Sequence, residues 1–365
     1  MIRSKIGLII LVFLLNTKIK ERQNSCTDFD MKWLRRNNIS RVFWELNSLK
    51  RTKDLKSLLE KKDEITKISI NSSNLKKLPD ILFEFKNLEE LDVSDNRFED
   101  IENLIIDLSR FTKLKVLNIA FCGIKRLPDN LGLLNHLEAI SFRGNKLVDI
   151  DNIGELLNLK YLILRRNKTL KDLPESINKL KCLQVLSISA TGIHRLRDEL
   201  SECKQLISVI ANASKIRTIT PKIGELKNLR NFNLGYNRIK DLPNSIGKLS
   251  SLEDLSLGSN EIQNLPNSIS NLQNLDGIGL EYNRFKKFPH QVLKLKKIRL
   301  LKLHNNYIPS IPIELAYLPR LSLLYVDHEM ISDKNIINLK KENPKIDIKR
   351  HDALRRAPGK PKRKI

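Results

Sequence analysis

The stretch LRNFNLGYNRIKDLPNSIGKLSS, residues 229–251, decides the fold. Its apolar residues follow one another at steps of three, two, five, three, four and three. A single amphipathic helix would place them every three or four residues, and a single half-buried strand every second residue. The mixed steps therefore predict a unit that contains a short strand, a turn and a returning segment.

The same pattern recurs along the chain. The stretch LEDLSLGSNEIQNLPNSISNLQN, residues 252–274, reproduces it position by position, and the units that begin at Leu275 and Ile298 continue it. Each of these units has 23 residues, with apolar residues at positions 1, 4, 6, 11, 14, 18 and 21. Asn usually occupies position 9, and Pro often occupies position 15.

The register extends backward to Ile65 and forward to Leu321, which gives about 12 units over residues 65–343. Three units depart from 23 residues, with 26, 22 and 24 residues from their starts at Leu88, Leu137 and Leu159. We expect these differences to fall in the returning segments, because a loop there can change length without moving the strands.

Several of the recurring positions within the unit have a physical explanation. Positions 4 and 6 alternate with other residues, as one side of a strand requires. An Asn amide at position 9 can bond backbone groups of adjacent turns, forming a structural ladder. Stacked units bury their leucines between neighbours and pair their strands in parallel. The sequence therefore predicts an α/β fold, a right-handed solenoid with a parallel concave sheet and short helical or 3-10 convex returns. The ladder residues are Asn96, Asn145, Asn167, Asn237, Asn260, Asn283 and Asn306.

The pattern resembles the 23-residue LxxLxLxxNxLxxLPxxIxxLxx class of leucine-rich repeat proteins. That class includes plant intracellular Ras-group proteins, animal Ras-binding scaffold proteins and many bacterial repeat proteins. The resemblance implies a platform that binds another protein on the concave strand face, but the shared residues are those of the scaffold, which do not identify a partner. Glu102, Asp151, Arg197 and Thr220 replace the proline, so we expect less regular returns there.

The N-terminal residues 1–25 are predicted to be a signal or hydrophobic segment. MIRSK carries two positive charges, and the apolar run IGLIILVFLL (6–15) is short for a membrane span. We therefore expect an exported protein or one associated with the cell envelope. The alternatives are a cytoplasmic chain with a buried or misassigned start, and lipid attachment at Cys26.

Both ends of the predicted array need caps. Residues 26–64 carry Trp33 and Trp44 and are predicted to form a helical N-terminal cap, with a separate binding module as the alternative. The C-terminal cap is expected to include a helix that begins at Ser332 or Asp333. Residues 344–365 are assigned to the end of that cap and to a basic, disordered tail.

No chemistry-bearing motif is found in the sequence. The six histidines and four cysteines are dispersed, and neither a CxxC pair nor a Gly-rich phosphate loop occurs. A disulfide between Cys182 and Cys203 is an alternative to free thiols, although the two occupy different repeat positions. We expect no enzyme activity, no metal, no cofactor and no small-molecule substrate, and a monomeric protein.

The resemblance implies that positions 3, 5, 7 and 8 of each unit face the concave side. Aromatic and Arg side chains in these columns have the composition of an interface hot spot; the alternative is an unselected surface. Arg165 and Arg166 could together bind a carboxylate or a phosphate. The candidate partner-binding residues are Phe121, Arg143, Tyr161, Ile163, Arg165, Arg166, Tyr236, Tyr282, His304 and Tyr325.

The chain is strongly basic, with 66 Lys and Arg against 42 Asp and Glu, a formal charge of +24. The alternative function is therefore binding of an anionic surface, namely nucleic acid, envelope polymer or lipid, through a basic edge and the basic tail. The simpler explanation of these basic residues is that they keep the protein soluble, because acidic residues interrupt the basic edge. We define the basic edge by positions 12 and 13: Lys76, Lys77, Lys125, Arg126, Lys240, Lys286 and Lys287.

Overall fold

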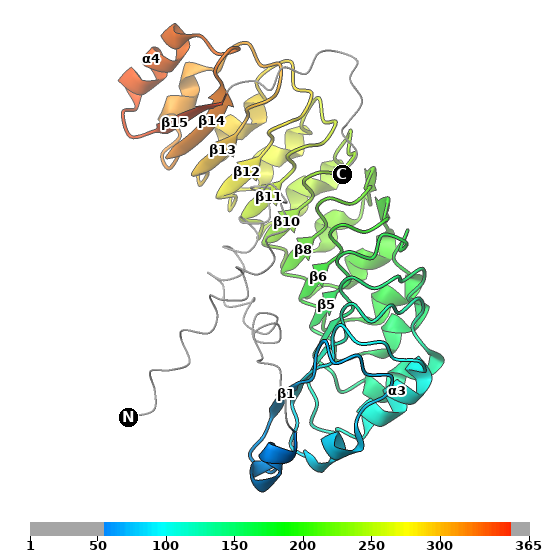
Figure 1. The fold of residues 1–365 in the computed structure, drawn as a ribbon. Coiled ribbons are helices and arrows are strands. Elements are labelled where there is room, and N and C mark those ends of the chain that lie inside the picture. The colour runs from blue at the N-terminus through cyan, green and yellow to red at the C-terminus, as the bar shows by residue number, and fades with distance from the viewer. Residues whose placement is uncertain (1–54, 352–365) are drawn as a thin grey trace. The chain divides into compact units, whose positions relative to one another are not determined.

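The computed structural model describes residues 55–351, which divide into two compact units, unit 1 ending at Lys215 and unit 2 beginning at Ile216. Figure 1 shows the helices and strands of both units. The predicted signal segment, most of the predicted N-terminal cap and residues 352–365 of the tail lie outside the described residues.

The described part of unit 1 is a series of parallel strands that pair in chain order. These strands are β1 (Lys67–Ser69), β2 (Glu90–Asp92), β3 (Val116–Asn118), β4 (Ala139–Ser141), β5 (Tyr161–Ile163), β6 (Val185–Ser187) and β8 (Ser208–Ile210). A further two-residue strand, β7 (Arg195–Leu196), follows β6. The helical segments are η1 (Lys56–Lys61), η2 (Asp80–Glu84), α3 (Ile101–Ser109), η3 (Asp129–Leu134), η4 (Asp151–Glu155), η5 (Glu175–Lys179) and η6 (Asp198–Glu202).

Unit 2 repeats this arrangement. Its paired parallel strands are β10 (Asn231–Asn233), β11 (Asp254–Ser256), β12 (Gly277–Gly279), β13 (Leu300–Lys302), β14 (Leu323–Asp327) and β15 (Asp347–His351), with the short β9 (Thr218–Ile219) before them. Its helical segments are η7 (Ile223–Glu225), η8 (Asn244–Lys248), η9 (Asn267–Asn271), η10 (His290–Lys294), η11 (Ile313–Tyr317) and α4 (Asp333–Glu342).

The strands lie at positions 3 to 5 of the predicted units. In unit 2, for example, Phe232 pairs with Leu255, Leu255 with Ile278, and Ile278 with Leu301. All four occupy position 4 and are inaccessible to solvent. The predicted α/β solenoid with a parallel sheet and 3-10 returns is therefore confirmed.

Shared aliphatic side chains form the core of each unit. Leu234, Leu257 and Leu280 occupy position 6 of successive units, and all three are 0% exposed. Burial of one leucine contributes about 1.5–3 kcal/mol relative to leaving it exposed. Neighbouring turns thus stabilise one another by covering leucines that a single turn would leave in water.

The position-9 asparagines bond the backbone of adjacent turns. In unit 1, Asn145 Oδ1 accepts hydrogen bonds from the backbone N–H groups of Cys122 and Ile124, both at 3.0 Å. Its Nδ2 donates to the carbonyl groups of Ile119 and Phe142, both at 3.0 Å. One side chain thus connects a turn to the turn before it. The other six asparagines in this column make the same kinds of backbone bond.

The prolines of the repeat precede the returns and do not begin them. Pro243, for example, is the N-cap of η8 with an extended ψ of 145°, and its carbonyl accepts from the Ile246 N–H at 2.9 Å. Arg197 takes the same place before η6 with an extended ψ of 167°. Because η6 has the five-residue length of the proline-headed returns, the prediction of an irregular return at Arg197 is wrong.

Two of the three unusual unit lengths are accommodated in returns. The 26-residue unit contains α3, a full α-helix capped by Asp100, whose side chain accepts from the Asn103 N–H. The 22-residue unit is shortened just before η4, where Ile150 is not extended. The extra residue of the 24-residue unit instead lies between Asn167 and Leu170, closer to the strand than predicted.

The returns η8 and η9 approach each other closely at a glycine. A Cβ atom on Gly247 would lie 2.1 Å from the Ser268 carbonyl oxygen. We therefore expect Gly247→Ala to lower the free energy of unfolding by about 2 kcal/mol, measured by urea denaturation. Gly132→Ala is the control, because its Cβ would meet its nearest neighbour, Glu155 Cβ, at an ordinary 3.4 Å. Equal stability of the two variants would contradict this account.

The described part of unit 2 ends in a helix and a strand. Ser332 is the N-cap of α4, and its side chain accepts from the Asn335 N–H at 3.3 Å. Ile336 and Leu339 of α4 are buried, whereas Ile337 is 64% exposed. The strand β15, which pairs with β14 and ends at His351, was not predicted; it lies in residues 344–365, which were expected to hold the end of the cap and a disordered tail.

Candidate functional site

The candidate site lies on the strand side, which we define as the side of each sheet that bears positions 3 and 5. Position 8, just beyond each strand, has a left-handed backbone in every repeat from the one that begins at Ile65 to the one that begins at Ile298. Its φ values include 58° at Phe121, 65° at Arg166, 57° at Tyr236 and 55° at Tyr282. A non-glycine residue in this conformation costs about 1–2 kcal/mol. The fold therefore holds large side chains at these positions in one fixed backbone geometry.

In unit 1, Phe121 and Arg143 lie together. The Arg143 guanidinium carbon is 5.4 Å from the centroid of the Phe121 ring, a cation–π contact. The ring also covers Gly144, on which a Cβ atom would lie 2.2 Å from Phe121 Cε1. Phe121 is nevertheless 42% exposed. The two neighbouring repeats that contain Phe121 and Arg143 thus present an aromatic ring in a defined position.

A second contact on the same side centres on Tyr161. It packs against Val116 and Ala139, which are buried on the strand side of β3 and β4. Burial raises the pKa of the Tyr161 hydroxyl above its ordinary value. Ile163 follows on β5, and Arg165 and Arg166 follow just after it; all three are half-buried. The predicted cluster of unit 1 is therefore made of two small contact groups and a neighbouring pair of arginines.

In unit 2, the predicted residues Tyr282, His304 and Tyr325 come together, joined by His351 of β15. The His304 ring contacts all three others, at centroid distances of 5.4 Å to Tyr282, 5.8 Å to Tyr325 and 4.4 Å to His351. His304 is only 7% exposed, so it supports its neighbours and offers a partner little surface. Burial, with smaller contributions from the nearby positive groups of His351 and Lys302, lowers the pKa of His304 to about 3.

Glu281 is a buried carboxyl group that is not among the residues predicted from the sequence. It is 4% exposed, its Oε2 atom has no hydrogen-bond partner in the described residues, and burial raises its pKa. The side chain lies over two glycines, since Cβ atoms on Gly258 and Gly279 would be 2.6 Å and 2.9 Å from its carboxylate oxygens. The run of position-7 glycines before Glu281 is the signal that could have identified it.

Tyr236 lies apart from this aromatic group, two strands away from Tyr282. It is half-buried, and its backbone N–H donates to the Gly258 carbonyl at 2.8 Å. His351 could not be placed from the repeat pattern because β15 follows the last unit. The alternation of Ile346 and Ile348 with polar residues was the available signal for that strand.

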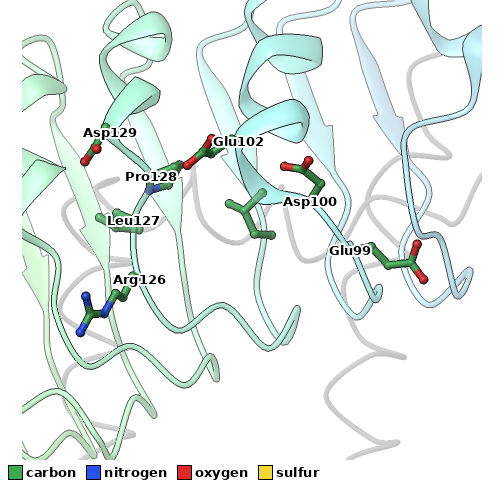
Figure 2. A pocket seen from close by; sticks show the side chains of 8 residues that line it. Glu99, Asp100, Glu102, Arg126, Leu127, Pro128 and Asp129 are labelled. Atoms are coloured by element: carbon green, nitrogen blue, oxygen red, sulfur yellow. The ribbon is translucent and has the colours of Figure 1, made fainter.

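A surface pocket of about 430 Å³ lies beside the start of α3 in unit 1. Figure 2 shows that its charged side chains do not converge, because Glu99 and Arg126 point away from each other. Glu99 is also paired with Lys76, at 2.7 Å. The acidic residues here include Asp100, which caps α3, so the pocket is explained by the local structure of the helix start.

The basic edge and the returns are partly neutralised by acidic neighbours. Besides the Lys76–Glu99 pair, Lys179 is 2.9 Å from Glu155 across adjacent returns. Residues 55–351 contain no group of three or more His, Cys, Asp or Glu side chains placed to hold a metal ion. Over the same range, no helix has the length and apolar character needed to cross a bilayer. Cys122, Cys182 and Cys203 are free thiols, so the alternative disulfide is not formed.

Comparisons with known families match three stretches of the chain. Residues 141–224 match the family described as leucine-rich repeat region. Residues 227–285 and 87–109 match families described as leucine rich repeat. No curated protein has significant sequence similarity to the chain.

Solved structures similar to this fold include an internalin, inlF, from Listeria monocytogenes strain 4b F2365. Its TM-score is 0.64 at 22% identity, and the similarity covers 80% of this chain and 88% of the internalin. TLR13, in its complex with ssRNA13, gives a TM-score of 0.64 at 23% identity, with coverage of 78% and 42%. The ectodomain of the Arabidopsis thaliana receptor kinase GASSHO1/SCHENGEN3, in complex with CASPARIAN STRIP INTEGRITY FACTOR 2, gives 0.55 at 23%, with coverage of 72% and 37%. These similarities concern the fold.

Proposed function

We propose, on the premise that this chain is a leucine-rich repeat protein, that it is a non-enzymatic scaffold that binds a protein partner on its strand side. Solved structures of similar fold include TLR13 in complex with ssRNA13 and the receptor kinase GASSHO1/SCHENGEN3 in complex with CASPARIAN STRIP INTEGRITY FACTOR 2, which supports an interaction role in general. The partner and the residues it contacts are part of the proposal.

The observation that carries the proposal is the half-exposed Phe121 ring held beside Arg143. Phe121 is 42% exposed, and a partner that covers exposed apolar surface of this kind gains binding free energy. Aromatic and Arg side chains are also the residue types enriched at the energetic centre of interfaces. The left-handed backbone at Phe121 and the contact with Gly144 fix the ring before binding, which reduces the entropy lost on association.

Site-specific photo-crosslinking in the producing cells tests the binding side. A benzoylphenylalanine at Phe121 or Tyr161 is expected to form an adduct of one defined mass with a partner protein. Matched control positions are Leu133 and Leu157, which are 50% and 52% exposed and lie in or beside the returns η3 and η4. We expect no such adduct from them.

A second variant separates the contact from mere proximity. Arg143→Ala, combined with the crosslinker at Tyr161, should reduce the adduct about tenfold, because a hot-spot truncation costs about 1–2 kcal/mol. Adducts that are the same from the strand side and from the returns, or that are absent from both, would overturn the proposal.

Salt distinguishes this function from the alternative of anionic-surface binding. Binding of a polyanion through the basic edge and tail would fall steeply between about 50 and 200 mM salt. A desolvated hot spot is expected to weaken far less over that range. A steep salt dependence that survives Arg143→Ala would favour the anionic surface.

We also propose that the protein is exported or associated with the cell envelope. The support is the signal-like segment over residues 1–25. Mass spectrometry of the mature N-terminus, with cell fractionation, is the test. Loss of the first fifteen or more residues is expected, and an intact chain in the cytosolic fraction would overturn export.

A further inference from the structure

The described sheet of unit 2 ends in a strand whose outer edge is unpaired. β15 follows β14 in the order of the strands, and no other strand of residues 55–351 pairs with its far side (Figure 1). The Asp347 N–H donates to the Ser322 carbonyl at 2.8 Å, across the β14 side. Backbone groups of successive residues in a strand point in alternate directions. The N–H and C=O groups of Ile348 and Arg350 therefore point away from β14, toward the unpaired edge.

The side chain of Ile348 lacks the cover that its counterparts have. Ile348 pairs with Leu324, which in turn pairs with Leu301. Both leucines are 0% exposed, because the following strand covers them, whereas Ile348 is half-buried. Covering exposed apolar surface is favourable. An additional strand with an apolar residue beside Ile348 would supply that cover.

β15 is held in place although one of its edges is unpaired. All five of its residues pair with β14. The Arg350 guanidinium forms an ion pair with Asp333 at the start of α4. It also donates to the His328 and Ile331 carbonyls, at 3.0 Å and 3.2 Å. A strand fixed in this way loses little entropy when a partner pairs with it.

The surroundings of this edge are basic. Residues 332–351 contain six Lys or Arg and three Asp or Glu side chains. Two of the acidic groups are already neutralised, Asp333 by Arg350 and Asp347 by Lys349. The other four lysines of this stretch are exposed: Lys334, Lys340, Lys341 and Lys345. Electrostatic complementarity therefore favours an acidic partner over a neutral or a basic one.

Charge also argues against two other occupants of the edge. Pairing with β15 of a second copy would bring the same lysines against each other, and like charges on neighbouring strands are destabilising. A lysine on an edge strand, such as Lys349, discourages pairing of that kind. Residues 352–365 carry six Lys or Arg and one Asp, so the same repulsion would oppose them.

We propose that the outer edge of β15 binds an extended acidic segment of a partner protein as an additional strand. The backbone groups of Ile348 and Arg350 would bond the segment and supply affinity, and its alternate side chains would supply specificity. An apolar residue of the segment would cover Ile348. The acidic residues beside it would lie on the strand side, near Lys349 and His351. This surface belongs to unit 2 and adds to the proposed function without depending on it.

A synthetic peptide that alternates glutamate and valine is the probe, and its binding to the full chain is followed by fluorescence anisotropy. A peptide that alternates lysine and valine is the control for charge, and it is expected to bind at least about tenfold more weakly. Two N-methylated forms of the acidic peptide test strand pairing itself. One form is methylated on the glutamate amides and the other on the valine amides.

We expect one of the two methylated peptides to lose binding and the other to keep it. Only alternate amides of an added strand point toward β15, so only one set of methyl groups blocks the pairing. Which set does so tells whether the added strand is parallel or antiparallel. A contact made by charge alone would bind both forms equally.

Amide hydrogen exchange locates the bound peptide. The N–H groups of Ile348 and Arg350 should exchange about tenfold more slowly or less when the acidic peptide is bound. The Lys349 N–H faces β14 and should change little. Lys345→Glu reverses a charge two residues before β15 and should weaken binding about fivefold. Lys296→Glu, at an exposed lysine after η10, is the matched control and should weaken it much less.

Protection of the Ile348 and Arg350 amides before any peptide is added would overturn the proposal, because residues 352–365 or a second copy would then occupy the edge. Equal behaviour of the two methylated peptides would also overturn it, as would equally tight binding of the lysine peptide or no binding of the acidic one. Equal effects of Lys345→Glu and Lys296→Glu would place the contact elsewhere. None of these results changes the crosslinking expected at Phe121 and Tyr161, which belong to unit 1.

Discussion

Replacing Asn260 by alanine is expected to lower the free energy of unfolding by about 3 kcal/mol. Asn260 is 8% exposed. Its Oδ1 accepts from the Ile239 N–H at 3.0 Å, and its Nδ2 donates to the Leu234 and Leu257 carbonyls, both at 2.9 Å. The two carbonyls keep a second amide donor each, from Asn237 and Asn283. The Ile239 N–H loses its partner outright, and a small cavity adds to the cost.

Amide hydrogen exchange is the sharper measurement, because an array of repeats need not unfold in one step. The Ile239 amide should exchange much faster in Asn260→Ala than in the natural chain. Asn264→Ala is the control, since Asn264 lies in the same unit and is exposed. If the Ile239 amide were equally protected in both variants, the side chain would not be what holds that turn to its neighbour.

The repeat could be predicted from the sequence because each unit states the same constraint. A leucine at position 4 or 6 is buried by the neighbouring repeats. The spacing of the leucines therefore predicts where each strand and each return lies. Leu234, Leu257 and Leu280 illustrate this, as each is 0% exposed at the expected place. The position of the extra residue beside Asn167 was predicted wrongly, because a side chain there stabilises the longer turn. The Thr169 hydroxyl donates a hydrogen bond to the Leu147 carbonyl at 2.7 Å.

The strand-side contacts could be predicted only in part. Columns of positions 3, 5, 7 and 8 identify which side chains share a face, and they selected Tyr282, His304 and Tyr325. They do not show how far a side chain reaches across strands. His351 stacks on His304 although β14 lies between their strands, and Glu281 turns away from His304 because glycines leave room on its other side.

Acid is expected to destabilise the protein through His304. In the folded chain, burial holds the pKa of this imidazole at about 3, whereas an unfolded histidine has a pKa of about 6.5. Between these values the unfolded state binds a proton that the folded state does not. The stability that depends on a neutral His304 is therefore present above pH 6.5 and is lost as the pH falls toward 3.

His304→Phe isolates this contribution. Phenylalanine keeps a ring against Tyr282, Tyr325 and His351, and it breaks no bond at Nδ1, which has no hydrogen-bond partner in the described residues. From pH 7 to pH 5 the natural chain should lose about 2 kcal/mol of unfolding free energy relative to the variant. Urea denaturation at the two pH values measures this difference.

The comparison must be made against the variant because other buried groups act in the opposite direction. Burial raises the pKa values of Glu281 and Asp327, so these carboxyls take up protons in the folded state first, which favours folding as the pH falls. Both groups are present in the natural chain and in His304→Phe, so their contribution cancels in the difference. His328→Phe, at an exposed histidine, should show the pH dependence of the natural chain. If His304→Phe lost as much stability between pH 7 and pH 5 as the natural chain, the prediction would be wrong. His304 would then take up its proton in the folded state while its ring stayed packed against Tyr282, Tyr325 and His351.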